Sequence, residues 1–443
     1  RDPEVEEREV DILIVGGGMA ACGTAFEVKK WMSDDQSVLL VDKAALERSG
    51  AVAQGLSAIN TYVGDNSPED YVRMVRNDLM GIVREDLIYD LGTHVDDSVH
   101  LFEEWGLPIW KKSEEGKTLD GKKGQKMGTL KGGATPVRTG KWQIMINGES
   151  YKRIVAEAAK LAIGEENILE RVFIVELLLD ADKDNQIAGA VGFSVRENKV
   201  FIIKCKTMMV ACGGAVNIYQ PRSVGEGKGR AWYPVWNSGS TYTLAMKVGA
   251  ELSMMENRFT PARFKDGYGP VGAWFLLFKA KTLNGLGENF AASDAAKAEL
   301  ERYAPYGTAA ITPTCLRNHL MLFEMKEGRG PIMMDTVTAL AELGKTMDKK
   351  ELKHLESEAW EDFLDMTCGQ ANLWCATNTE PEKKNSEVMP TEPYLLGSHS
   401  GCCGLWTSGP DLDWVPDAYK IKADNGKVYN RMTTVNGLFT SGD

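Results

Sequence analysis

The sequence predicts an α/β fold, and three observations along its 443 residues lead to that prediction. The stretch EVDILIVGGGMAACGTAFEVKKW, residues 9–31, gives an apolar run, a glycine turn and an alanine-rich segment with helical spacing. Short apolar runs return between about residues 170 and 212, separated by turn residues. Polar segments with helical spacing fill residues 265–390. This order favours an α/β domain interrupted by a helical insertion, in a chain long enough for two or three units of about 150 residues.

The glycine turn is the first candidate binding element. Gly16, Gly18 and Ala21 fit the pattern G-x-G-x-x-G/A. In that pattern the first glycine allows a tight turn, the second lets a diphosphate approach the backbone, and the third position keeps helix and strand close. The next apolar run, SVLLVDK, ends at Asp42, where a carboxylate can accept hydrogen bonds from ribose hydroxyls. Strand, turn, helix and closing acid together predict a Rossmann-like dinucleotide site.

Further elements follow from local signals. In NSPEDYVRMVRNDLMG, Ser67 is placed as the N-cap of a helix and Pro68 at its first position. RVFIVELLLDADKDNQIAGAVGF and KVFIIKCK are predicted as strands around the turn-rich DADKDN, and TMMVACGGA as a further strand that Gly213 and Gly214 close. GLFTSGD, residues 437–443, is predicted as another strand. Because a domain seldom ends there, and because the chain starts without methionine, we expect a fragment.

Composition excludes several classes of protein. The 51 basic and 63 acidic residues give a net charge of -12, which argues against generic nucleic-acid binding. The 8 cysteines are spread along the chain with no signal-peptide pattern, which favours a reducing compartment, and we expect a cytoplasmic protein. No apolar run approaches the roughly 20 residues of a membrane helix, so we expect membrane contact only through a partner.

The arrangement of these motifs resembles the fumarate reductase and succinate dehydrogenase flavoprotein family. The resemblance rests on GGGMAA, the closing Asp42, VACGGA and GLFTSGD, in that order. It implies a Rossmann-like FAD-binding domain with a β-meander, interrupted by an α+β capping domain and followed by a C-terminal helical domain that this fragment lacks. The implied boundaries are residues 1–264 and 391–443 for the FAD-binding domain and 265–390 for the capping, substrate-binding domain.

Within this family, several words are similar to the adenylylsulfate reductase branch, among them AVAQGLSAINTYVGDN, AWYPVWNSGSTYT, GQANLW and LGSHSGCCG. This similarity implies an FAD-dependent interconversion of adenylylsulfate with AMP and sulfite through a flavin N5-sulfite adduct. It also implies a ferredoxin-like beta subunit with two [4Fe-4S] clusters, since no cysteine spacing here suits such a cluster. A membrane electron-transfer complex could then be reached through that subunit.

Departures from the dicarboxylate members point the same way. Members with covalent FAD carry a histidine shortly before their AQGG motif, whereas residues 47–55 here are ERSGAVAQG, so a noncovalent FAD is expected. Their FHPT word is replaced by FTPAR, residues 259–263. The alternatives are a fumarate or succinate oxidoreductase of the same fold and a non-catalytic flavoprotein.

The resemblance also implies roles for particular residues. Asn60, Trp232 and Arg263 are expected at the flavin ring, where a guanidinium offers a rigid fork for the sulfite oxygens. A cap salt bridge remains the alternative for Arg263, and Trp236 competes with Trp232. Further substrate-pocket candidates are Glu149, which otherwise only caps a helix; Arg317, for the AMP part; and an apolar wall for the adenosine formed by Trp274, Phe275, Leu276 and Phe278. The residues expected to hold FAD are Gly16, Gly18, Ala21, Asp42, Lys43, Ser49, Gly55, Gly213, Gly214 and Asp443.

The glycine-rich stretch LGSHSGCCG, residues 396–404, allows three interpretations. A metal site is disfavoured because no C-x-x-C pair or second histidine supplies its ligands, and a disulfide between Cys402 and Cys403 would be strained. His399 takes the place of the histidine that binds substrate in the HYxMGG word of the family. The stretch is therefore predicted to be a substrate loop without a metal, whose cysteines pack as small apolar groups.

Overall fold

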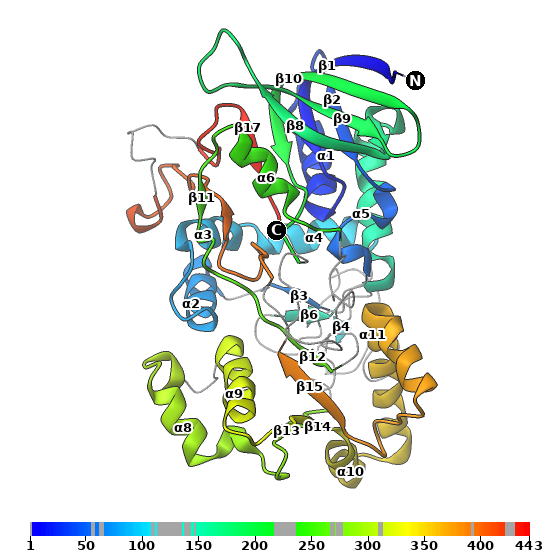
Figure 1. The fold of residues 1–443 in the computed structure, drawn as a ribbon, viewed down its shortest axis with the longest axis vertical. Coiled ribbons are helices and arrows are strands. Elements are labelled where there is room, and N and C mark those ends of the chain that lie inside the picture. Colours follow the sequence, from blue (N-terminus) through cyan, green and yellow to red (C-terminus); the bar gives the residue numbers. More distant parts are fainter. Residues whose placement is uncertain are drawn as a thin grey trace.

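The structure of the protein is a computed structural model. It describes residues 2–54, 58–61, 66–107, 111–112, 135–136, 143–145, 148–216, 236–265, 271, 278–308, 313–390, 394–420 and 430–443, and every statement about the structure refers to these ranges. The predicted strands and helices around the glycine turn form a large upper domain, and residues of the cap form the lower part of the molecule (Figure 1).

A seven-stranded sheet forms the centre of the upper domain. Its order is β7 (Ile168–Glu170), β2 (Val38–Asp42), β1 (Glu4–Val15), β10 (Lys199–Val210), β9 (Ile187–Ser194) and β8 (Val172–Leu179), with β17 (Leu438–Thr440) also on β10. Strands β7, β2, β1, β10 and β17 are parallel, whereas β8, β9 and β10 follow one another antiparallel as a meander. The α/β class with a Rossmann-like core and a meander is thus confirmed.

Strand β10 corrects one sequence prediction. KVFIIKCK and TMMV, which we expected as two strands, form a single strand of 12 residues. Its whole length pairs with β1, its first part also pairs with β9, and its last residues, Met208–Val210, pair with β17. The side chains alternate between buried and more exposed positions through this stretch, so nothing in the local pattern interrupts the strand. The meander is thereby joined directly to the parallel sheet.

Different elements cover the two faces of the parallel strands. Helices α1 (Met19–Trp31) and α5 (Gly148–Ile163) pack on the face that carries Ile14 and Leu40. The meander and helix α6 (Ser240–Lys247) cover the face that carries Leu13 and Val41. Since successive side chains of a strand point to opposite faces, the continuous apolar runs of β1 and β2 are buried on both sides.

The segment between β2 and α5 adds three helices, α2 (Pro68–Asp78), α3 (Glu85–Gly92) and α4 (Val95–Glu104). The predicted cap of α2 is confirmed, because Ser67 and Asp70 form a capping box. Short elements complete this domain: η1 (Leu46–Arg48), η2 (Ala51–Gln54), η3 (Glu165–Asn167), η6 (Asp417–Tyr419), and the strand pairs β3 (Ala58–Asn60) with β6 (Gln143–Met145), β4 (Lys111–Lys112) with β5 (Thr135–Pro136), and β11 (Leu252–Ser253) with β16 (Gly404–Leu405).

The cap combines a four-stranded sheet with helices around a separate core. Its elements are β12 (Ala262–Phe264), β13 (Lys281–Leu283), η4 (Phe290–Ala292), α8 (Asp294–Glu301), η5 (Tyr306–Thr308), α9 (Thr314–Lys326), β14 (Met333–Asp335), α10 (Thr336–Thr346), α11 (Lys349–Ala376) and β15 (Ser386–Pro390). The sheet order is β12-β15-β14-β13. Strand β12 pairs with β15 of the cap and ends at Phe264, so the expected boundaries near residues 264 and 390 stay a prediction.

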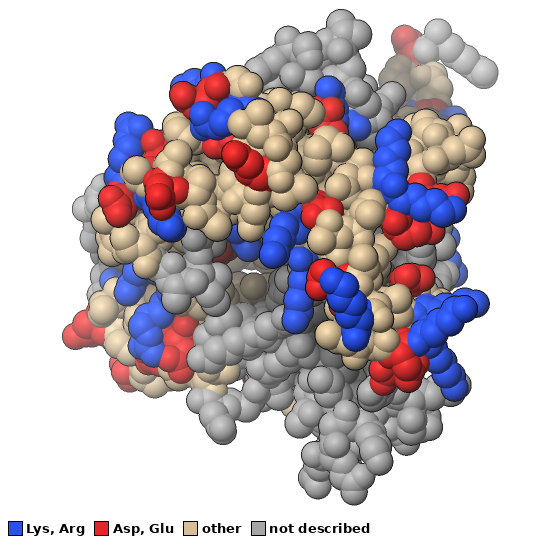
Figure 2. All heavy atoms as spheres, turned by 90° about the horizontal axis from the view of Figure 1, so that it is seen from below, with Lys and Arg blue, Asp and Glu red and all other residues tan. Residues whose placement is uncertain are grey.

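Two further observations concern the surface charge and the hydropathy of the helices. On the described part of the lower face, basic and acidic side chains are interspersed (Figure 2). No helix of the described ranges is long and apolar enough to cross a membrane.

Candidate active site

A cavity of about 270 Å³ opens where the carboxyl ends of β1, β2 and β10 meet. Ligands of open α/β sheets bind at this edge. Its lining comprises Val15, Gly16, Gly17, Gly18, Met19, Ala20, Val41, Asp42, Lys43, Ser49, Gly50, Ala51, Val52, Val172, Phe173, Ile174, Ala211, Cys212, Gly213, Trp236, Asn237, Ser240, Ser398, His399, Ser441, Gly442 and Asp443. Segments from the beginning, middle and end of the chain therefore meet at one site.

The glycine turn provides the backbone for an anion. Gly16 has φ +120°, and a Cβ there would clash with the carbonyl oxygen of Ala211. Gly18 is the N-cap of α1 and has no side-chain capping bond, so the first N–H groups of the helix face the cavity. A Cβ on Gly50 would lie 2.8 Å from the Cα of Gly18, which shows how closely the two loops approach. Ala21 does not line the cavity but is fully buried between helix and sheet.

Asp42 supplies the acidic side chain that the second strand predicts. It is 4% exposed, and within the described residues its Oδ2 has no hydrogen-bond partner. Burial raises the pKa of Asp42, while a hydrogen bond from Ser49 and bonds from the backbone oppose that rise. Leaving a buried carboxylate oxygen unpaired is costly, so this atom is suited to accept a hydrogen bond from a ligand hydroxyl.

Lys43 and the second glycine pair shape the other walls. The Nζ of Lys43 donates to the carbonyl oxygen of Trp236 at 2.9 Å, and it lies 5.3 Å from the ring centroid of Phe173. Gly213 lines the cavity with φ +78°. Gly214 does not line it, but a Cβ there would clash with the carbonyl oxygen of Leu395. Gly214 therefore lets the predicted substrate loop approach the strand end.

That loop places His399 in the cavity wall. Its ring lies 4.6 Å from the ring of Phe259, and its Nδ1 lies 2.8 Å from the Oγ of Ser398. Ser398 also bonds to the Oδ1 of Asp443, through its hydroxyl and, at 3.1 Å, through its backbone N–H. Because a carboxylate only accepts, the hydroxyl donates to Asp443 and accepts from the Nδ1–H of His399. The Nε2 of a neutral His399 is then an acceptor.

Burial lowers the pKa of His399 from its ordinary value of 6.5, and the nearby Asp443 opposes this change. The neutral imidazole is therefore favoured at pH 7. Ser398 was not among the sequence candidates. Its position before His399 was visible, but the 45-residue separation from Asp443 concealed its bridging contact.

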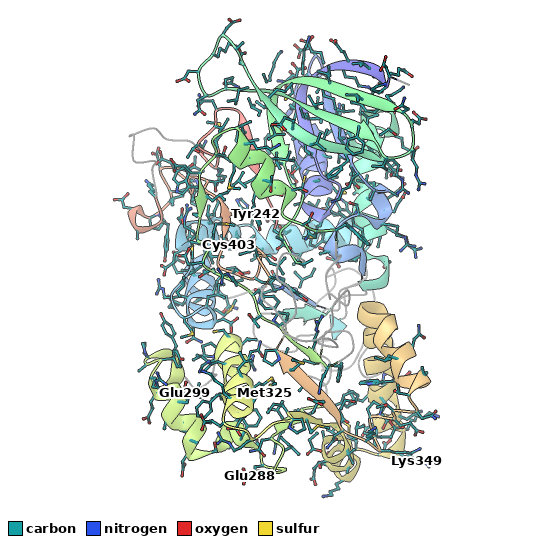
Figure 3. All side chains as sticks on the ribbon, viewed as in Figure 1. Tyr242, Glu288, Glu299, Met325, Lys349 and Cys403 are labelled. Carbon is teal, nitrogen blue, oxygen red and sulfur yellow. The ribbon has the colours of Figure 1, made fainter. Side chains whose placement is uncertain are left out.

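The two cysteines of the loop are free thiols. Cys403 is 5% exposed and lies beside Tyr242 of α6 (Figure 3), while Cys402 packs against the apolar cluster under α2 and α3. Burial raises the pKa of Cys402 to about 12 and that of Cys403 to about 11. Both thiols are therefore protonated at neutral pH and pack as small apolar groups.

The remaining described candidates do not line this cavity. Arg263 is 7% exposed in the cap strand β12. Asn60 of β3 is oriented by Tyr71, whose hydroxyl donates to the Asn60 Oδ1 at 2.8 Å. Arg317 is exposed on α9, where its Nη2 donates to the Oγ1 of Thr314 at 2.6 Å. The expected roles of Asn60 and Arg263 at the flavin, and of Arg317 at the AMP part, stay predictions.

Several candidates fall outside the described residues. These are Gly55, Trp232, Trp274, Phe275 and Leu276, and the side chain of Glu149 in α5. Phe278 is described, and it is buried in the core of the cap. Trp236, the competitor of Trp232, does line the cavity and is 55% exposed.

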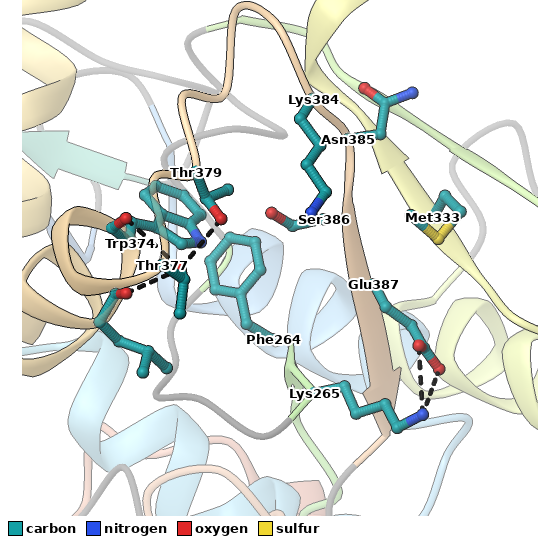
Figure 4. A pocket seen from close by; sticks show the side chains of 11 residues that line it. Phe264, Lys265, Met333, Trp374, Thr377, Thr379, Lys384, Asn385, Ser386 and Glu387 are labelled. Atoms are coloured by element: carbon teal, nitrogen blue, oxygen red, sulfur yellow. Dashed lines mark hydrogen bonds and ion pairs between the residues drawn. The ribbon is translucent and has the colours of Figure 1, made fainter.

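A second cavity of about 400 Å³ lies in the cap and shares no lining residue with the first (Figure 4). It lies between the end of α11 and the start of β15. Lys265 pairs with Glu387 at its rim, and the ring of Trp374 meets Phe264 edge-on at 4.9 Å. The charged groups at its rim and the aromatic rings in its wall thus already have partners within the protein, and we assign no ligand to this cavity.

Known proteins resemble this chain over its whole length. A family model described as an FAD binding domain matches residues 11–267. The alpha subunit of adenylylsulfate reductase from Megalodesulfovibrio gigas is 66% identical over 446 residues, covering 100% of this chain and 67% of that protein. The chain belongs to the adenylylsulfate reductase alpha-subunit family. The resemblance predicted from the motifs is confirmed.

Other members of the wider group set this result in context. The solved structure of an adenosine-5-phosphosulfate reductase in complex with sulfite, as a covalent adduct, matches with a TM-score of 0.89 at 53% identity and covers 100% of this chain and 66% of that chain. A polypeptide of the fumarate reductase (CoM/CoB) of Methanothermobacter marburgensis is 26% identical over 408 residues, covering 89% of this chain and 64% of that protein. The chain spans about two thirds of the length of these relatives.

The cavity fits the FAD of this adenylylsulfate reductase family. The uncapped start of α1 and the glycines at positions 16 and 18 suit a diphosphate, and the unpaired Oδ2 of Asp42 suits a ribose hydroxyl. The cofactor prediction is confirmed for FAD.

Proposed function

We propose that this protein interconverts adenylylsulfate with AMP and sulfite, using a noncovalently bound FAD. One observation carries the proposal: the loop of His399 meets the dinucleotide cavity, in a chain 66% identical to the alpha chain of an adenylylsulfate reductase. The related structure with a covalent sulfite adduct supports the same chemistry. When bound, the flavin supplies the position at which sulfite adds and the path for the exchanged electrons.

The residues of the chain bind and orient in this scheme. The start of α1 and Asp42 hold the diphosphate and the ribose of the cofactor. Asp443 and Ser398 orient His399, and we assign its Nε2 the role of proton acceptor for the substrate. We assign Asn60 and Arg263 the role of binding the sulfite oxygens, where fixed hydrogen-bond donors stabilise developing negative charge. Trp232 is assigned to the flavin ring, and Glu149, Arg317, Trp274, Phe275 and Leu276 to the nucleotide part.

The electrons are exchanged with a second subunit. We assign to this partner the ferredoxin-like character and the two [4Fe-4S] clusters that the family resemblance implies, and to the pair a cytoplasmic location with any membrane complex reached through the partner. The free thiols of the described cysteines are compatible with a reducing compartment.

The flavin spectrum of the full-length protein tests the proposal. Sulfite added with AMP should bleach the oxidised flavin band, and succinate should leave it unchanged. Reduction by succinate with no response to sulfite would establish the dicarboxylate oxidoreductase instead. A flavin that responds to neither would indicate a non-catalytic flavoprotein.

A further inference from the structure

Lys152 is a buried lysine beneath the cofactor cavity that has no role in the scheme above. It projects from α5, is 3% exposed, and its Nζ donates to the carbonyl oxygen of Leu46. The same Nζ lies 3.7 Å from the Sγ of Cys22, in the second turn of α1. One ammonium group therefore contacts both η1 and α1, the two segments whose neighbouring residues line the cavity.

Both contacts lead to the diphosphate loop. Leu46 begins η1, which continues into Ser49 and Gly50 of the cavity wall. Gly50 packs directly on Gly18, the N-cap of α1. The Sγ of Cys22 in turn lies 3.7 Å from the carbonyl oxygen of Gly17. Lys152 thus lies behind the loop, on the side away from a ligand in the cavity.

The charge of Lys152 is not neutralised by a close acid. Within the described residues its close partners are the carbonyl oxygen of Leu46 and the thiol of Cys22, and that thiol stays protonated because burial raises its pKa. A buried charge without a counter-charge is unfavourable, so the fold tolerates one here only if negative charge lies nearby. Asp42 and Glu47 are such groups: the charge of Lys152 opposes the rise in the Asp42 pKa that burial causes, and it adds to the lowering of the Glu47 pKa, of which the hydrogen bond from Lys160 is the largest cause.

Asp42 by itself would repel a diphosphate, which brings further negative charge to the same cavity. We propose that Lys152 is a positioning residue for FAD, whose buried positive charge offsets Asp42 and the cofactor diphosphate from behind the glycine loop. The ammonium group touches neither, and it acts through the low-dielectric layer formed by the loop.

Two substitutions of Lys152 separate the effect of its charge from that of its hydrogen bond to Leu46, which tethers α5 to η1. Lys152→Met removes charge and hydrogen bond together, whereas Lys152→Gln keeps a donor and removes only the charge. Lys160→Met is the matched control, because Lys160 lies two turns further along α5 and its charge is already paired with Glu47 of the same η1 turn. These variants are compared in the full-length holoenzyme.

The measured quantity is the dissociation constant of FAD, from the fluorescence of flavin released on serial dilution. Opposite unit charges about 12 Å apart, at an effective dielectric constant of about 20, change an affinity roughly tenfold. We expect both Lys152 variants to release FAD about tenfold more readily, and Lys160→Met to match the parent. ADP should bind the flavin-free variants about tenfold more weakly than the flavin-free parent, while adenosine, which lacks the diphosphate, should bind the variants and the parent equally.

Thermal unfolding of the flavin-free proteins completes the test. Because removing the lysine charge leaves the buried Asp42 without its offset, the flavin-free variants should be moderately less stable than the parent but remain folded at the temperature of the binding assay. If Lys152→Gln binds FAD like the parent while Lys152→Met does not, Lys152 is a tether and the charge proposal is wrong. Parent-like FAD affinity in both variants, or an equal loss for ADP and adenosine, also overturns it. A loss of stability large enough to account for the whole loss of FAD binding would also overturn the charge proposal.

Discussion

Ser398 offers the sharpest test of the substrate loop. Replacing it by alanine removes the hydroxyl that accepts from the His399 Nδ1 at 2.8 Å and donates to Asp443. Without it, the hydrogen bond that holds the proton on Nδ1 is lost, and the imidazole can turn or change tautomer. A typical hydrogen bond contributes about 1 to 1.5 kcal/mol net, which corresponds to a loss of roughly fivefold to twelvefold.

The assay is steady-state turnover of sulfite and AMP by the full-length enzyme with its partner subunit. Ser398→Ala should lower kcat about tenfold while retaining FAD, and Ser398→Thr, which keeps the hydroxyl, should recover most of the loss. Ser194→Ala is a matched control, since the Ser194 hydroxyl also serves two hydrogen bonds, in a turn outside the cavity. A kcat equal to that of the parent, or a loss that Thr does not restore, would refute the orienting role.

Three further outcomes are expected. Burial lowers the pKa of His399 from 6.5, so folding favours the neutral form. The resulting contribution to the free energy of unfolding is present above pH 6.5 and is lost as the pH falls through the lowered pKa. Urea unfolding between pH 7.5 and 5 should show this loss in the parent and not in His399→Ala. Arg263→Ala should retain flavin but turn over at least tenfold more slowly, because loss of one preorganised donor typically lowers the rate about 100-fold to 1000-fold. Lys265→Ala is the control, and parent-like turnover of Arg263→Ala would make Arg263 structural. Cys402→Ala and Cys403→Ala should keep activity within about threefold, since both thiols are protonated and packed, and elemental analysis should find no stoichiometric zinc; a metal-dependent loss of activity would contradict the packing interpretation.

Local signals predicted the start of the fold well. Gly16, Gly18 and Asp42 line the cavity from one strand–turn–helix–strand unit, whose spacing along the chain was enough to predict that they lie together. The capping box of Ser67 and Asp70 is likewise contained in four residues. Such features depend on neighbouring backbone positions, and the chain order reveals them.

Contacts between segments that are far apart in the chain could not be predicted from local sequence patterns. The bond from Ser398 to Asp443 depends on β17 lying beside the end of β10, and no periodicity specifies that pairing. Lys152 was hidden for a related reason, because a lysine on a helix predicts a solvated face, whereas here α5 packs against η1 and α1. Gly214 was assigned to the cofactor together with Gly213; it does not line the cavity, and it lies where a Cβ would clash with the carbonyl oxygen of Leu395.

Product formation tests the proposed function most directly. The full-length protein with its partner subunit is given sulfite, AMP and a two-electron acceptor, and adenylylsulfate is quantified together with the reduced acceptor. We predict one adenylylsulfate for each two electrons transferred, with no formation when AMP is omitted and no acceptor reduction by succinate. Acceptor reduction by succinate without any adenylylsulfate from sulfite and AMP would contradict the account.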